Sequence, residues 1–126
     1  MTELEQLIAD LETATGPDRA LDERIALALG WTCHRGYGNK AALDLWTLPA
    51  GLSKCATNFP PAFTGSYDAA RSTVPRNLLR LCFGWQSTRK WMATLKVGGP
   101  VQETAAVAAT EILAMLAASM RLRLPS

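Results

Sequence analysis

The sequence predicts an α+β protein, an α/β/α layered sandwich in which a small, mostly antiparallel sheet of about four strands has helices packed on it. Two patterns indicate this class. Apolar residues recur at helical spacing near both ends of the chain, and they alternate with other residues between positions 78 and 97. The chain has 126 residues, of which 48% are hydrophobic, and this size is typical of one domain with one core. Residues 1–126 are therefore predicted to form a single domain.

Two helices are predicted in the N-terminal part of the chain. Thr2 and Glu5 have the spacing of a capping box, and leucine and isoleucine residues follow at helical spacing, so the first helix should begin after Thr2 and end before Gly16. A second helix is expected from about Pro17 to Leu29. Proline is favoured in a first helical turn, and Gly30 is well placed to end the helix.

The middle of the chain is predicted to contain two strands, a long loop and a short helix. The strand candidates are residues 31–35 and 42–48, and the glycine-rich residues between them suit a turn. The segment from Leu48 to Phe63 has little periodicity and is expected to be a long loop. Thr64 or Ser66 can then cap a short helix that ends before Pro75.

Residues 78–97 are predicted to form a β-hairpin around which the rest of the chain is organised. Each of its two runs alternates between an apolar face and a mixed, more polar face, as half-buried antiparallel strands do. Both tryptophans of the hairpin fall on the apolar face. The side chains expected to face the core are Leu79, Leu81, Phe83 and Trp85 in the first run, and Trp91, Ala93, Leu95 and Val97 in the second.

The alanine-rich chain after Pro100 is predicted to form one last helix. Thr110 is a good N-cap for it, and Thr104 is an alternative start. Arginines in the final turn suit the negative end of the helix dipole. The buried stripe expected for this helix consists of Ile112, Leu113, Leu116 and Met120.

The charges are distributed unevenly along the chain. Residues 1–23 hold seven acids and one base, whereas residues 24–126 hold twelve bases and four acids. The stretch from Arg71 to Lys96 has six bases and no acid. One interpretation is an electropositive surface for nucleic acid or an acidic protein, and the other is a basic side balanced by the acidic N-terminal helix.

Residue patterns for catalysis, metals and membranes are weak. The three cysteines form no C-x₂-C pair, and no phosphate-binding loop occurs. Cys33 and the single histidine, His34, are neighbours that would point to opposite faces of a strand, and the other cysteines are distant in the sequence, so a nucleophile pair is not indicated. We therefore predict a protein that is not an enzyme and uses neither metal nor cofactor. Because no apolar run reaches the length of a membrane span, no membrane contact is expected, and the odd cysteine count suits a reducing cytoplasm.

Three segments taken together resemble the phage ABA sandwich domain, a family of small phage and prophage proteins. They are LDERIALALGW at Leu21 to Trp31, PAFTGSYDAARSTVP at Pro61 to Pro75, and TEILAMLAASMRLR at Thr110 to Arg123. The resemblance implies an α/β/α sandwich and a phage or prophage origin, with the cytoplasm of a bacterial host as the location. It implies no catalytic residues.

The functional prediction is a small phage-encoded interaction protein whose partner is a host or phage protein. Inhibition of a host defence system, as by an anti-CRISPR protein, is the specific form that the resemblance implies. The alternative is a nucleic-acid-binding accessory protein that uses the basic hairpin from Arg76 to Lys96. The residues predicted to contact the partner are Arg76, Arg80, Arg89, Lys90 and Lys96 of the basic stretch, and Leu52 and Phe59 of the long loop.

Overall fold

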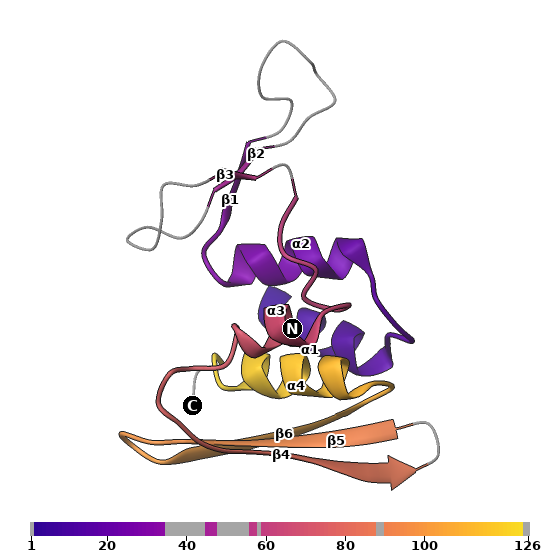
Figure 1. Ribbon diagram of the computed structural model, residues 1–126, viewed down its shortest axis with the longest axis vertical. Coiled ribbons are helices and arrows are strands. Elements are labelled where there is room, and N and C mark those ends of the chain that lie inside the picture. The colour runs from indigo at the N-terminus through magenta and orange to yellow at the C-terminus, as the bar shows by residue number, and fades with distance from the viewer. Residues whose placement is uncertain (1, 35–44, 48–55, 58, 88–89, 125–126) are drawn as a thin grey trace.

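The computed structural model describes residues 2–34, 45–47, 56–57, 59–87 and 90–124 (Figure 1). The predictions for Arg89, Leu52 and the turn at residues 36–39 lie outside these ranges. In chain order the elements are α1 (Glu3–Thr13), α2 (Arg19–Ala28), β1 (Thr32–His34), β2 (Leu45–Thr47), β3 (Ala56–Thr57), α3 (Tyr67–Arg71), β4 (Leu78–Ser87), β5 (Lys90–Val97), β6 (Gln102–Ala108) and α4 (Glu111–Arg121).

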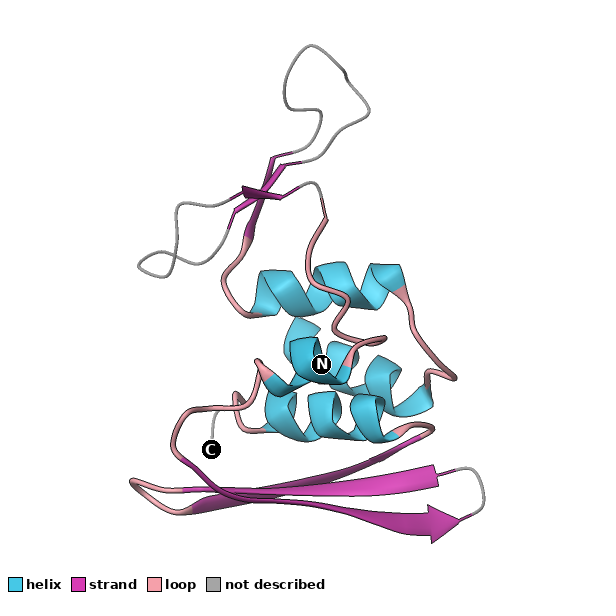
Figure 2. Ribbon diagram, in the orientation of Figure 1, coloured by secondary structure: helices cyan, strands magenta, loops and turns pink. Residues whose placement is uncertain are grey.

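The described strands form two antiparallel sheets with the helices between them. The sheets have the strand orders β1-β2-β3 and β4-β5-β6. Figure 2 shows all the described helices on one side of the β4-β5-β6 sheet, with the small β1-β2-β3 sheet beyond α2. The α+β class, with a small antiparallel sheet packed against helices, is thus confirmed. The strands are divided between two sheets, however, and the far face of β4-β5-β6 has no helix on it among the described residues.

Helix α4 is the centre of the core. It packs on β5 and β6 on one side and on α1 and α3 on the other. Every residue from Leu113 to Met120 is buried, as expected for a helix that has neighbours all round. Buried alanines of α4 and of the β4-β5-β6 sheet leave room for the helix to pack closely on the sheet. The predicted N-cap is confirmed, because the hydroxyl of Thr110 accepts a hydrogen bond from the Leu113 amide at 3.1 Å.

Strand β6 was not predicted from the sequence. Its residues pair with β5 along their full length, from Gln102 opposite Val97 to Ala108 opposite Trp91. Thr104, considered above as a helix start, lies inside this strand and donates to the carbonyl of Ala118 in α4 at 2.9 Å. Alanine has no strong strand preference of its own, so pairing with a distant strand determines the structure here.

The predicted hairpin is confirmed, but two of its side chains are far more exposed than expected. Leu81 and Phe83 lie opposite Leu95 and Ala93 on the helix-facing side, as predicted. Leu79 is 61% exposed, because a break in the register between Leu78 and Arg80 gives its inward position to Leu78.

Trp85 is the second exception, since it was assigned to the core and is 66% exposed. The position of Trp85 explains this exposure. It lies near the turn end of β4, which is an edge strand of the sheet. Its ring rests on that of Trp91, which is itself only partly buried.

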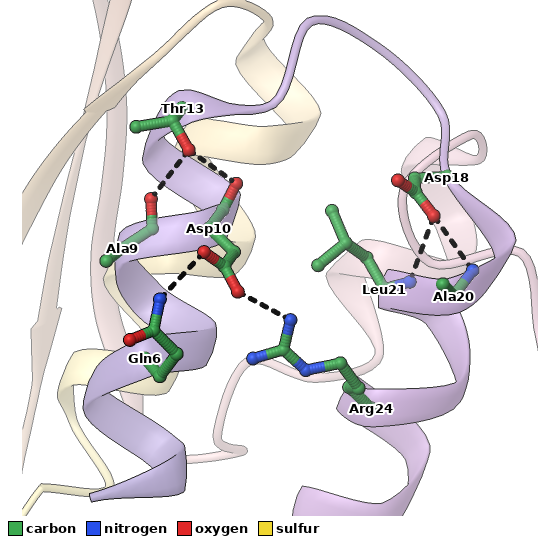
Figure 3. A network of polar contacts seen from close by, with 8 residues as sticks. All are labelled: Gln6, Ala9, Asp10, Thr13, Asp18, Ala20, Leu21 and Arg24. Atoms are coloured by element: carbon green, nitrogen blue, oxygen red, sulfur yellow. Dashed lines mark hydrogen bonds and ion pairs between the residues drawn. The ribbon is translucent and has the colours of Figure 1, made fainter. Parts of the chain in front are cut away.

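The first two helices are joined by side chains on facing surfaces (Figure 3). The carboxylate of Asp10 in α1 accepts hydrogen bonds from Gln6 at 3.0 Å and from the Arg24 guanidinium of α2 at 2.6 Å. Helix α2 begins later than predicted because Asp18, not Pro17, supplies its N-cap and accepts from the amides of Ala20 and Leu21.

A buried cluster also holds the segment before α3 against α2. Thr64 donates its amide hydrogen to Asp22 Oδ1 at 2.7 Å, and its hydroxyl accepts from the Asp18 amide at 2.8 Å. Asp22 is only 6% exposed, so its carboxylate is satisfied inside the protein. Ser66 then caps α3 by accepting from the Ala69 amide, as one of the two predicted starts requires.

The Asp10 to Arg24 contact predicts a dependence of stability on acid. Hydrogen bonds from Arg24 and then Gln6 hold the pKa of Asp10 below its ordinary value of 3.8. Because the pKa is lower in the folded protein, the contribution is present above that value and is lost as the pH falls through the folded pKa. We expect Asp10→Asn to be less stable than the wild type at pH 7, and the difference to vanish in strongly acidic buffer. Urea unfolding of both proteins across the acid range measures this difference in stability. A difference that stays constant with pH would contradict the stabilising role given to the ionised Asp10 carboxylate.

Candidate functional site

The uncovered face of the β4-β5-β6 sheet carries part of the predicted binding surface. Register places Arg80 of β4, Lys96 of β5 and Glu103 of β6 in one row across the three strands. Arg80 Nη2 lies 3.3 Å from Glu103 Oε1, and both side chains are about half exposed. An ion pair this exposed contributes little to stability. It does place an acid beside the stretch from Arg71 to Lys96, which contains none in the sequence.

The turn end of the hairpin presents an exposed aromatic pair. We call Trp85, Lys90 and Trp91 the hairpin-end surface. The two indole rings have centroids 4.3 Å apart and an interplanar angle of 37°. Trp91 packs partly against the core, Trp85 is 66% exposed, and Lys90 is exposed at the first position of β5. The outer ring is therefore held by a ring that is itself anchored in the protein.

The remaining predicted residues are not grouped with this surface. Arg76 is exposed in the turn before β4, at the opposite end of the strand from Trp85. Phe59 is 62% exposed, and the Arg19 guanidinium lies 4.5 Å from its ring centroid at the first turn of α2. In Figure 1, α2 lies on the far side of the helical layer from β4 and β5. Phe59 and the basic hairpin are thus separated in the structure, although the sequence-based prediction placed them next to each other.

Groups that could hold a metal were sought among the described residues, and no cluster of three or more histidine, cysteine, aspartate or glutamate side chains occurs there. Cys33 and Cys82 lie in different sheets, the first half-buried and the second exposed. Within the described ranges, no helix has both the length and the apolar composition needed to cross a bilayer.

Sequence reasoning assigned Trp85 to the core and so missed it as a site residue. The alternation of apolar residues gave its face correctly, because Trp85 and Trp91 are register partners. What alternation cannot give is how far the helical layer extends along a strand. The position of the two tryptophans in the sequence could have indicated exposure, because both lie near the predicted hairpin turn, where a strand can extend beyond the helices that cover it.

Comparison of the chain with protein-family models, with curated proteins and with solved structures gives no match. The resemblance to the phage ABA sandwich domain therefore stays a prediction from the three segments that carry it.

Proposed function

We propose that this protein is a non-enzymatic binding protein that contacts a protein partner through the hairpin-end surface. The observation that carries the proposal is the exposure of Trp85, which leaves a large aromatic side chain 66% accessible on a well-paired strand. Tryptophan is the residue most enriched among side chains that dominate binding energy, and burying its ring against a partner removes a large apolar area from water.

The contact between the two indole rings supports the same proposal. Trp85 stacks on Trp91, and Trp91 belongs to β5, the central strand of its sheet. A side chain that is already ordered loses little conformational freedom when a partner covers it, so more of the contact energy appears as affinity. Lys90, the exposed residue before Trp91 in β5, adds a positive charge at this end of the hairpin and favours a partner that carries acidic groups.

Nucleic acid is the second candidate partner, favoured by the same pair of features. A base can stack on an exposed indole ring while a lysine contacts the phosphate, as in many single-strand-binding proteins. The ion pair between Arg80 and Glu103 counts against it, because that arginine already faces a carboxylate. Protein is therefore the first choice.

The class of partner is proposed from the resemblance stated above. A host protein is the partner that a phage origin implies, and a component of a host defence system, the target of an anti-CRISPR protein, is its specific form. This part of the proposal rests on the three resembling segments and receives no support from the geometry.

Capture from bacterial lysate with wild-type protein and two variants tests the proposal. Trp85→Ala is expected to weaken binding of the captured partner by about 2 kcal/mol or more, roughly thirtyfold, because it removes the exposed ring. Leu79→Ala is the matched control, since Leu79 is 61% exposed near the other end of the same strand and should leave the affinity unchanged. Circular dichroism of both variants checks that the fold is intact.

Nuclease treatment of the lysate separates the two candidate partners. A protein that is captured equally well after nuclease digestion supports the proposal, provided that Trp85→Ala releases it. If nuclease digestion abolishes capture, nucleic acid is the partner, and its affinity for the protein should fall steeply with added salt. Equal losses for Trp85→Ala and Leu79→Ala would show that the tryptophan has no special role.

A further inference from the structure

A groove of about 550 Å³ lies between α1 and α2 and is also lined by a residue that follows α4. In Figure 3 the two helices run side by side in opposite directions, and Arg24 reaches across from α2 to Asp10 of α1. Leucines from both helices line the groove. Its lining residues are Glu3, Leu4, Gln6 and Leu7 of α1, Arg24, Leu27 and Ala28 of α2, and Arg123 after α4.

The apolar part of the groove has an aliphatic character. Leu7 is 3% exposed and forms part of the core, while Leu27 is 53% exposed. The described residues that line it include no aromatic side chain. A volume of this size falls within the range of small-molecule sites, and burying methylene groups on such a surface favours binding.

Arg123 gives the groove a cation that lacks an acidic partner among the described residues. Its Nη2 donates to the Thr73 carbonyl at 3.3 Å, and no carboxylate of the described residues lies within 4.0 Å of it. Burial lowers the pKa of Arg123, which reflects a charge partly removed from water. By contrast Arg24 is paired with Asp10, at 2.6 Å. A carboxylate is the group whose two oxygens best match a guanidinium.

We propose that this groove binds an aliphatic carboxylate, a fatty-acid anion of about ten carbons, which suits a small-molecule site of this size. The chain would lie over Leu4, Leu7 and Leu27, and the carboxylate would face Arg123. This inference is independent of the hairpin-end surface, because the groove and Trp85 lie on different elements.

Calorimetric titration of the full chain with decanoate, decanol and decyltrimethylammonium tests the ligand class. Decanoate is expected to bind about tenfold more tightly than decanol, equivalent to about 1.4 kcal/mol for the charge interaction, and the cation is expected to bind most weakly. Failure of decanoate to bind, or equal affinities for decanoate and decanol, would overturn the proposal.

Two substitutions locate the site. Leu27→Asp places a charge in the groove at an exposed position and is expected to weaken decanoate binding at least about tenfold. Leu79→Asp is its matched control on β4 and should leave the affinity within about twofold. Arg123→Gln should reduce the affinity for decanoate and leave that for decanol unchanged. Equal losses for Leu27→Asp and Leu79→Asp, or equal effects of Arg123→Gln on both ligands, would contradict the assignment, whatever the fate of Trp85→Ala in partner capture.

Discussion

Replacing Leu116 by alanine is expected to lower the free energy of unfolding by about 3–5 kcal/mol, at the upper end of the range for buried leucines. Leu116 is 0% exposed in α4, which is enclosed by the β4-β5-β6 sheet on one side and by α1 and α3 on the other. Because these layers restrain one another, the space left by the side chain cannot close by a small shift of one element. A loss of this size is a large part of the total stability of an ordinary domain, about 5–15 kcal/mol.

Urea unfolding followed by circular dichroism measures this loss. Leu27→Ala is the matched control, since it removes the same atoms from a helix position that is 53% exposed, and it should cost less than about 1 kcal/mol. If both variants were equally destabilised, α4 would not be the enclosed centre of the core.

Trp46→Ala is expected to have a comparable effect, about 3–5 kcal/mol, although β2 has only three residues. Trp46 is 1% exposed and belongs to the same core cluster as the helices. Removing the ring should therefore weaken the attachment of the small β1-β2-β3 sheet to the rest of the molecule. The unfolding midpoint in urea and its dependence on denaturant provide the measurement.

Trp85→Ala serves as the control for Trp46→Ala because it deletes the same side chain at an exposed position. Its expected loss is about 0.5–1.5 kcal/mol, the value of an aromatic pair contact, since only the stacking on Trp91 is removed. Similar losses for both variants would indicate that the small sheet does not pack on the helices as described.

The elements that the sequence predicted correctly are those with local signals. Thr2 and Thr110 cap helices whose first turns are encoded within three residues, and the hairpin alternates visibly. Strand β6 has no such signal. A short connection joins β6 to the preceding strand, β5. The alanines of β6 form a strand because the backbone of β5 pairs with them through hydrogen bonds. The bulge near Leu79 also depends on pairing, and a one-residue change of register moves a side chain between faces.

The candidate site was predictable only in part, for a related reason. The basic residues of the hairpin can be counted in the sequence, but Glu103 comes beside Arg80 only through the pairing of β6. The exposure of Trp85 depends on where the helical layer ends, and the groove at Arg123 depends on the packing of three helices. Each of these features is a relation between distant segments, which periodicity within one segment does not report.

The packing of α1 on α4 has a consequence for how fast the protein folds. Glu12 and Arg121, which join these helices, are 109 positions apart in the chain. With 11 residues, α1 is shorter than the roughly 12–15 at which isolated helices become even marginally stable in water, so it depends on this distant contact. Chains rich in such long-range contacts lose the conformational entropy of a long loop before the stabilising core contacts form. They therefore fold in milliseconds to seconds rather than microseconds. Until α4 is in place, α1 is expected to form only transiently.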